Sequence, residues 1–341
     1  MPLLRRLGVA AVALIALAAL AGTAAYVKGR EAFFAPGPSA SSTTAVVPKG
    51  AGVERIARLL AEAGTIDDPR LFRIGVRLSG QQTALRAGEY AFPPGVSMQG
   101  ILDMLAAGAV VQRRLTIPEG LTVKQALALV AAAPGLEGAV PETLPEGSLL
   151  PETHAYTLGE SRAALLKRMS AAMDRALASA WEGRAPDLPL ASPEEALILA
   201  SIVERETAVP AERPQVAAVF LNRLKIGMRL QSDPTVIYGL SGGNGTLERG
   251  LTRGDLDSET RYNTYVIDRL PPSPICLPGA AALAAVAHPA DAADLYFVAD
   301  GSGGHVFSKT LAEHTRNVAK WRAIQKAAKK AGKNQAGGSA P

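Results

Sequence analysis

The chain has 341 residues, of which 48% are hydrophobic and 20% are charged. This composition excludes a wholly disordered protein, and the length suits a membrane anchor followed by two domains. The single cysteine, Cys276, excludes an intramolecular disulfide and a zinc site built from several cysteines. It also fits an oxidising compartment, where unpaired thiols are a liability.

The formal net charge of +5 comes from the C-terminal end of the chain. From Lys320 onward there are six basic residues and no acidic ones, and the rest of the chain has 30 basic against 31 acidic residues. The body is therefore close to neutral, and we expect no nucleic-acid partner. We interpret residues 323–341 as a basic flexible tail.

The N-terminus is either a membrane anchor or an export signal. A run of 20 residues without a charge begins at Leu7 and ends at Tyr26, which is long enough for a membrane helix. The preceding Arg5 and Arg6 place the N-terminus in the cytoplasm and the rest of the chain outside it. The alternative is a cleaved signal peptide, because residues 19–21 have the small-x-small pattern that signal peptidase accepts. We expect an anchor over residues 1–30 and a linker over 31–44.

Three segments repeat one local pattern, which is an apolar strand end, a Pro/Gly turn and a helix start. They begin at residues 47, 92 and 117. Between the first two, helices are predicted over 53–63 and 69–78 and a strand over 88–92. This βααβ order resembles the LysM domain, which binds cell-wall glycans, and we assign it to residues 45–112.

The chemistry is concentrated in residues 192–308. Ser192 and Pro193 predict a helix start, and Glu195 would complete a capping box. On this helix Glu204 shares a face with Ala200 and Ser201, whose small side chains would leave room for a ligand. An apolar setting would raise the pKa of Glu204 and keep it protonated, as a general acid requires. Glu206 points to the opposite face, and the alternative is that both acids only solvate a helix end.

Amides, aromatic rings and an exposed acid on the following loops suit a neutral polyhydroxylated ligand such as a glycan. A hairpin is predicted near residues 295–308. The candidate substrate-binding residues are Gln231, Asp233, Tyr238, Asn263, Tyr265, His305 and, upstream, Glu152. Nothing in the sequence predicts a cofactor or a metal site.

Long blocks of this sequence closely resemble the endolytic murein transglycosylases of the YceG-like type. The longest blocks are ASIVERET at 200–207, VFLNRL at 219–224 and GMRLQSDPTVIY at 227–238. Shorter blocks are LPET at 150–153, YNTY at 262–265, AHP at 287–289, YFVAD at 296–300 and GHVF at 304–307. Leu277 and Arg261 depart from the residues common in that family. The resemblance implies an α+β fold, in which a LysM-like subdomain precedes a larger catalytic domain at 113–322, with Glu204 as the catalytic acid.

The resemblance further implies a lytic transglycosylase, a carbon–oxygen lyase that cuts the MurNAc–GlcNAc bond within glycan strands. It would leave a 1,6-anhydroMurNAc end and terminate strand elongation beside penicillin-binding proteins of the inner membrane. One acid suffices for this reaction, whereas a hydrolase usually needs two carboxylates. Glu152 is the first candidate for a second carboxylate, followed by Glu206 and Asp233. The alternatives are a lysozyme-like hydrolase and a non-catalytic peptidoglycan-binding scaffold.

Overall fold

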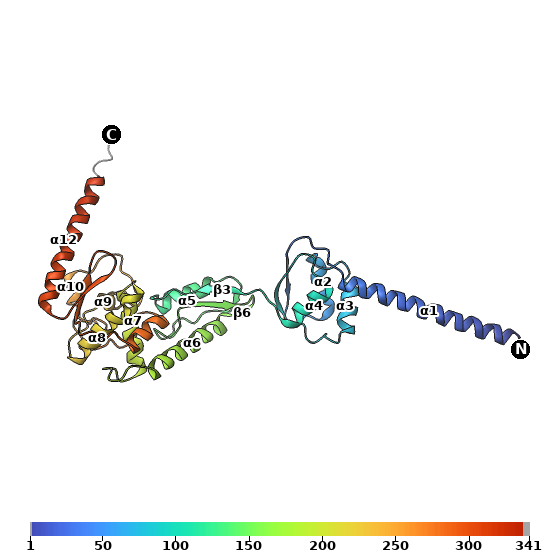
Figure 1. Ribbon diagram of the computed structural model, residues 1–341, viewed down its shortest axis with the longest axis horizontal. Helices are drawn as coiled ribbons and strands as arrows, with labels where there is room; N and C mark the ends of the chain where they lie inside the picture. The colour runs from blue at the N-terminus through green and yellow to red at the C-terminus, as the bar shows by residue number, and fades with distance from the viewer. Residues whose placement is uncertain (1, 337–341) are drawn as a thin grey trace. The chain divides into compact units, whose positions relative to one another are not determined.

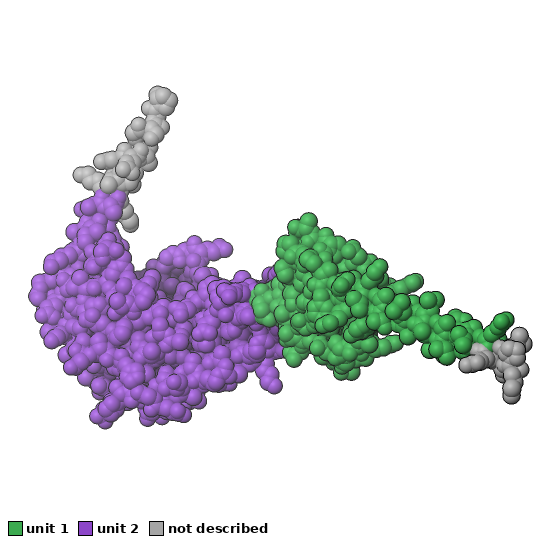
Figure 2. Space-filling model, turned by 45° about the vertical axis from the view of Figure 1, so that its right-hand side comes forward, with its two compact units in different colours: residues 1–113, 156–159 green, residues 114–155, 160–341 purple. Residues whose placement is uncertain are grey.

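The computed structural model describes residues 2–336 and the side chains of residues 6–328, and it mixes helices with short strands (Figure 1). The chain divides into two compact units, coloured separately in Figure 2. Unit 1 contains residues 1–113 and 156–159, and unit 2 contains residues 114–155 and 160–341.

Unit 1 has the predicted βααβ order, preceded by one long helix. Its elements are α1 (Pro2–Phe34), β1 (Thr43–Val47), α2 (Val53–Glu62), α3 (Pro69–Leu78), β2 (Gly88–Phe92) and α4 (Met98–Ala107). β1 and β2 pair antiparallel, from Thr43 opposite Phe92 to Val47 opposite Gly88. The helices cover a core whose largest fully buried side chains include Phe72, Tyr90 and Phe92. The likeness of this unit to LysM stays a prediction.

The three repeated turns have the local structure that the sequence predicts. β1, β2 and β3 (Arg113–Thr116) each lead through a turn into α2, α4 and α5 (Val123–Ala132) respectively. The turn glycines Gly50, Gly95 and Gly120 have φ values of 74°, 65° and 77°. A side chain is strained in this left-handed region, so glycine is the residue that allows each turn to be tight.

α1 continues past the expected start of the linker at residue 31, because its last turn is part of the core of unit 1. Phe33 is only 6% exposed and stacks on Phe72, with ring centroids 6.4 Å apart. α1 packs against α3 and α4. The close approach needs Gly75 on α3, since a Cβ there would lie 2.2 Å from the Phe33 ring.

Unit 2 is built around helices that pack on one another. Its first elements are β3, α5, β4 (Leu136–Glu137), β5 (Thr153–Tyr156), β6 (Glu160–Ser161), α6 (Arg162–Glu182) and α7 (Pro193–Glu206). The remaining ones are η1 (Pro210–Glu212), α8 (Arg213–Lys225), α9 (Asp233–Leu240), α10 (Arg253–Leu256), α11 (Ala280–Ala287), β7 (Tyr296–Ala299), β8 (His305–Ser308) and α12 (Leu311–Ala336). β3 pairs with β5, β4 with β6, and β7 with β8, the last pair being the predicted hairpin. α7, α8 and α11 pack together and form the centre of the core.

The start of α7 differs in one detail from the predicted capping box. Ser192 caps the helix as expected, since its hydroxyl accepts a hydrogen bond from the Glu195 N–H at 3.3 Å. The Glu195 carboxylate, however, accepts from the N–H of Ala191 at 2.8 Å and not from that of Ser192. The cap still satisfies backbone donors that the first turn leaves unpaired, with the second bond displaced by one residue.

The C-terminal segment is helical well beyond Arg322, where we expected the folded domain to end. α12 runs to Ala336. Alanine and lysine, which are abundant here, have high helix propensity. The flexibility of the basic tail at 323–341 stays a prediction, and its residues 337–341 lie outside the described ones. Ile324 belongs to the folded part, since it lies against Gly301 of the β7–β8 turn.

We predict that Gly75→Ala loosens the junction between α1 and α3. The added methyl group would overlap the Phe33 ring, which cannot move without opening the core, and this should cost about 1–2 kcal/mol of unfolding free energy. Hydrogen exchange of the full chain in detergent should show lost protection at residues 30–34. Gly29→Ala is the control, because its methyl group would meet Leu71 at an ordinary 3.6 Å. Equal protection in the two variants would contradict the packing described here.

Candidate active site

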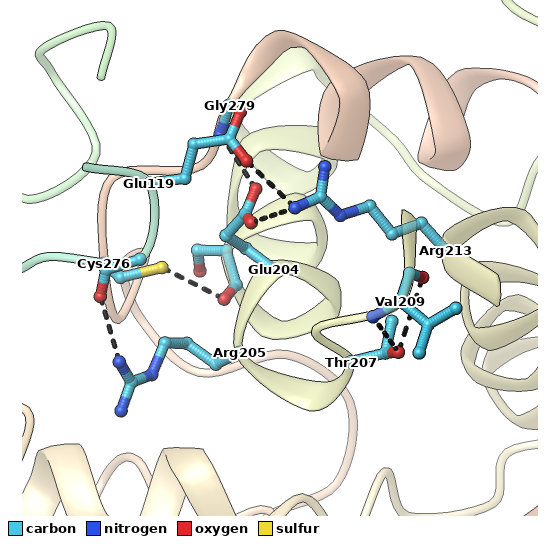
Figure 3. A network of polar contacts seen from close by, with 10 residues as sticks. Glu119, Glu204, Arg205, Thr207, Val209, Arg213, Cys276 and Gly279 are labelled. Atoms are coloured by element: carbon cyan, nitrogen blue, oxygen red, sulfur yellow. Dashed lines mark hydrogen bonds and ion pairs between the residues drawn. The ribbon is translucent and has the colours of Figure 1, made fainter. Parts of the chain in front are cut away.

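Glu204 lies in the last turn of α7 and is almost completely enclosed. Its side chain is 3% exposed. One carboxyl oxygen accepts a hydrogen bond from Nη2 of Arg213 at 2.7 Å, and the other accepts from the backbone N–H of Gly279 at 3.0 Å (Figure 3). Arg213 begins α8 and Gly279 precedes α11, so the three helices that form the core also hold this carboxyl group.

Glu119 is a second carboxyl group at the same place, and the sequence analysis did not select it. It sits in the turn between β3 and α5, and its carboxyl group accepts from the same Arg213 nitrogen at 2.9 Å (Figure 3). The accepting oxygens of Glu119 and Glu204 therefore cannot be further apart than the sum of the two hydrogen-bond lengths. Gly279 makes this approach possible, because a Cβ there would lie 1.9 Å from a carboxyl oxygen of Glu119.

The environment favours a proton on Glu204. Burial raises the pKa of Glu204, and although the Gly279 hydrogen bond and the Arg213 charge act against this, the net direction is upward. The charge of Glu119 and a hydrogen bond between the two carboxyl groups raise the pKa of Glu204 further. This direction agrees with the requirement for a general acid.

The residues after Glu204 each contact a different segment of unit 2. Arg205 donates to the carbonyl oxygens of Gly120 and Gly245, both at 3.2 Å, and so holds the turn that carries Glu119. Thr207 is buried and donates to Glu212 at 3.1 Å. The ERET sequence thereby fixes the end of α7 in relation to the loops around the carboxyl pair.

Glu206 belongs to a separate polar cluster, as its predicted position on the other face of the helix requires. It accepts a hydrogen bond of 2.5 Å from the hydroxyl of Ser232. Burial raises its pKa to about 7. Glu206 is thus a structural partner of the loop before α9, and the alternative that Glu204 merely solvates a helix end is wrong.

The space beside Glu204 is not left open for a ligand by Ser201, contrary to our expectation. The backbone N–H of Ile275 donates to the Ser201 hydroxyl at 3.0 Å, and the Cys276 thiol donates to the Ser201 carbonyl at 3.2 Å. A small residue at this position therefore lets the Pro-rich loop pack on α7. This packing carries the loop onward to Gly279 and the carboxyl pair.

Six of the seven predicted substrate-binding residues, all except Asn263, retain exposed or half-buried side chains. Gln231 and Tyr265 line a depression of about 500 Å³ together with Arg229 and Arg253. The hydroxyl of Tyr265 donates to the exposed Asp233 at 2.7 Å. Gln231 has a φ of 52°, which is uncommon outside glycine and marks a constrained loop.

Tyr238 lies in a different group of rings and carboxyls. Its ring meets that of Tyr262 edge to face, with centroids 4.8 Å apart, and its hydroxyl donates to Glu146 at 3.2 Å. Burial raises the pKa of Glu146 and that of Tyr238. Tyr238 therefore remains a proposed glycan contact, and the half-buried carboxyl group of Glu146 orients it.

The structure does not offer Asn263 to a ligand. It is fully buried, and its amide nitrogen donates to the carbonyl oxygens of Leu256 and Ser258 while its amide oxygen accepts from the N–H of Tyr265. These bonds fold the loop, because buried amides must pair with the nearest backbone groups. Asn263 thus supports the loop that presents Tyr265.

His305 and Glu152 remain proposed substrate-binding residues, and their surroundings differ. His305 forms a hydrogen bond with Glu212 through its Nδ1 at 2.7 Å, which extends the Thr207 contact to the β7–β8 hairpin. The side chain of Glu152 is exposed, and its carbonyl oxygen accepts from the N–H of Ile117. Glu119, rather than Glu152, shares the arginine with Glu204.

Sequence reasoning missed Glu119, Arg213 and Gly279. The signal for Glu119 was its place in the third repeated turn, where the first two turns carry Lys49 and Pro94. Arg213 follows a 3-10 turn at a helix start, where a basic residue is electrostatically unfavourable and so implies an acidic partner. Across the described residues, no group of three or more His, Cys, Asp or Glu side chains is placed to hold a metal ion.

The chain is similar to proteins of known family over most of its length. The profile of the YceG-like family matches residues 45–320. A Bacillus subtilis protein named endolytic murein transglycosylase is 28% identical, over 81% of this chain and 83% of its own length. A protein of the same name from Streptococcus pneumoniae is 29% identical over 81% of this chain, which corresponds to 58% of the streptococcal protein.

Structural comparison agrees with the sequence comparison. The crystal structure of a YceG-like protein from Listeria monocytogenes superimposes with a TM-score of 0.51 and 28% identity. The match covers 82% of this chain and 99% of the Listeria chain. By the match over residues 45–320, this chain is a member of the YceG-like family.

Proposed function

We propose that this protein is an endolytic lytic transglycosylase that cuts MurNAc–GlcNAc bonds in peptidoglycan strands. The observation that carries the proposal is the enclosed carboxyl group of Glu204, whose pKa is raised by burial, so that its protonated form is favoured as a general acid requires. The names of the Bacillus and Streptococcus relatives support the same class of reaction.

The reaction needs one group that first gives and then takes a proton. Glu204 protonates the glycosidic oxygen, the bond from C1 of MurNAc to this oxygen breaks, and GlcNAc leaves with a free hydroxyl. The 6-hydroxyl of the same MurNAc then attacks C1 and gives its proton to Glu204. The product is a 1,6-anhydroMurNAc end, and intramolecular attack benefits from a high effective concentration.

Arg213 and Glu119 stabilise the charges that develop when Glu204 gives up its proton. When Glu204 becomes a carboxylate, Arg213 stabilises the new negative charge at 2.7 Å. Positive charge develops at the same time on C1 of the sugar, and the Glu119 carboxylate is the group that can stabilise it, since its side chain is 40% exposed. Glu119 therefore acts as a second carboxylate in our proposal, ahead of Glu152.

The alternatives fit the site less well. An inverting hydrolase places a water between carboxyl groups roughly 6.5–9.5 Å apart, whereas here both groups bind one arginine nitrogen. A binding scaffold has no need for an enclosed acid of raised pKa, because burying an ionisable group costs free energy. The nature of the new chain end decides between the transglycosylase and a retaining hydrolase.

The location of the reaction follows from the N-terminal helix. α1 is long and apolar enough to cross a membrane. With Arg5 and Arg6 on the cytoplasmic side, unit 2 and the part of unit 1 that follows α1 would lie outside the inner membrane. We propose that the enzyme terminates nascent strands there, near penicillin-binding proteins, and that the LysM-like unit contacts the glycan.

We predict that Glu204→Gln removes nearly all activity while the fold is retained. The amide has the same volume and can accept the Gly279 hydrogen bond, but it cannot transfer a proton, so the rate should fall by roughly 10²–10⁴-fold or more. Mass spectrometry of digested glycan strands measures the rate and identifies the ends. The natural protein should release fragments with 1,6-anhydroMurNAc ends, which are lighter by one water than reducing ends.

The matched control for this experiment is Glu206→Gln. Its carboxyl group is two residues away, carries a hydrogen bond from Ser232 and has a pKa of about 7, so an amide should replace it at little cost. If the unsubstituted protein released glycan fragments with reducing ends, the enzyme would be a hydrolase. A variant Glu204→Gln with normal cleavage, beside an inactive Glu206→Gln, would exchange the roles of the two acids.

We predict that Glu119→Gln shifts the pH dependence of cleavage to lower pH and slows cleavage by about 10²-fold. Activity requires protonated Glu204 and is lost as pH rises through the pKa of that group. Glu119 raises this pKa, so removing its charge lowers the pKa and moves the alkaline decline toward acid. Glu152→Gln serves as the control and should leave the pH profile in place. A shift with Glu152→Gln alone would restore Glu152 as the second carboxylate.

A further inference from the structure

The junction between α1 and α3 in unit 1 has an apolar groove that the proposed reaction does not use. The groove has a volume of about 330 Å³ and runs from Ala25 and Tyr26 to Phe34 on α1, with Leu71, Ile74 and Leu78 on the α3 side. In Figure 1, α1 ends beside α3. Because Phe33 anchors α1 in the core, the groove is a built part of unit 1.

Large apolar side chains around this groove face water in the isolated chain. Phe34 is 54% exposed, Ile74 56% and Leu78 70%. Single exposed apolar residues are ordinary, but a group of them beside a groove marks an interaction surface. Burying such side chains contributes roughly 25 cal/mol for each Å² removed from water.

The position of the groove along α1 identifies the occupant. The uncharged run that ends at Tyr26 is as long as the hydrocarbon core of a bilayer is thick, about 30 Å. Tyr26 is thus at the level where aromatic residues meet the headgroups. Phe34 is eight residues further along the same helix, or about 12 Å, which is close to the outer edge of the headgroup layer when the helix is tilted. The groove therefore lies at headgroup depth.

Basic side chains surround the same surface. Arg70, Arg73 and Arg77 recur along α3 and, with Ile74, line a second depression of about 250 Å³. On α1, the guanidinium of Arg30 lies over the Phe34 ring, 5.8 Å from its centroid. α3 itself contains no acidic residue. Arginine pairs well with the phosphates of lipid headgroups, and apolar side chains between arginines fit the acyl boundary below them.

We propose that this surface, formed by the end of α1 and the outer face of α3, binds anionic phospholipids of the outer leaflet. It would hold unit 1 against the membrane, with Ile74 and Leu78 at the acyl boundary and the arginines on phosphates. The proposal rests on the membrane anchoring of α1 described under Proposed function, and it adds a second membrane contact that depends on lipid charge.

The test uses the full chain in vesicles of phosphatidylcholine with or without phosphatidylglycerol. A polarity-sensitive fluorophore is attached to Leu78→Cys, since Cys276 is fully buried and unreactive toward a bulky label. Quenching by a lipid that carries a shallow nitroxide reports contact with the bilayer. The control is the same label on Val46→Cys, an exposed apolar position on β1. We expect strong quenching at Leu78 with phosphatidylglycerol, and weak quenching at Val46.

Two pairs of substitutions test the role of charge. The double substitution Arg73→Gln with Arg77→Gln should lower the equilibrium ratio between the lipid-bound and the unbound state of this protein surface by roughly 30-fold. The reason is that each basic residue near an anionic surface contributes about 1 kcal/mol. Arg55→Gln with Arg58→Gln on α2 removes the same charge from an exposed face outside the groove and should have little effect.

The outcomes separate this proposal from the proposed function. If alkaline extraction leaves the protein in the vesicles but Leu78 is quenched no more than Val46, the lipid surface is overturned while the anchor stands. If alkaline extraction removes the protein, both are overturned. Equal effects of the two arginine pairs would show a diffuse charge effect and would also overturn a specific surface. Glycan cleavage by the labelled protein is read independently, so loss of lipid contact does not bear on the chemistry.

Discussion

The site depends on one constraint, which is that a carboxyl group enclosed in an apolar helix bundle must not be left as an unpaired carboxylate. Glu204 is 3% exposed, a position where an isolated carboxylate would be costly. Arg213 reduces this cost, because its guanidinium pairs with Glu204 at 2.7 Å and with Glu119 at 2.9 Å. The same burial raises the pKa of Glu204 and so favours its acid form. The packing of α7, α8 and the loop before α11 therefore determines both the stability of the core and the chemistry of the site.

The third copy of the repeated strand–turn–helix unit, which lies in unit 2, supplies Glu119. Gly50, Gly95 and Gly120 give the three turns the same left-handed backbone, so the residue before each glycine occupies an equivalent position. This residue is Lys49 in the first turn and Pro94 in the second, and it is Glu119 in the third. The third turn is held by Arg205 from α7. The third copy of this local motif thus carries a carboxyl group at the place where it meets the helix that holds Glu204.

Local features of the fold could be predicted from the sequence, and contacts between distant residues could not. The start of α7 follows from Ser192 and Pro193, and the βααβ order follows from apolar spacing between turn signals, because these signals lie within a few residues. Glu119 and Arg213 are 94 positions apart, and no local pattern shows that they meet. Asn263 was assigned to the glycan because its sequence context does not reveal whether an amide faces a ligand or its own backbone. The alanines and lysines after Lys320 favour the helix α12, and the flexibility of the basic tail stays a prediction.

Gly279 serves both carboxyl groups of the site, each in a different way. Its N–H donates to Glu204, and its missing side chain is the space that the Glu119 carboxyl occupies. Any larger residue would push Glu119 away from Arg213 and leave Glu204 as the only acid bound to the arginine. The arginine charge would then lower the pKa of Glu204 without the opposing effect of Glu119, and the acid would lose its proton at a lower pH. A backbone position in a Pro-rich loop thereby controls the protonation state on which the proposed reaction depends.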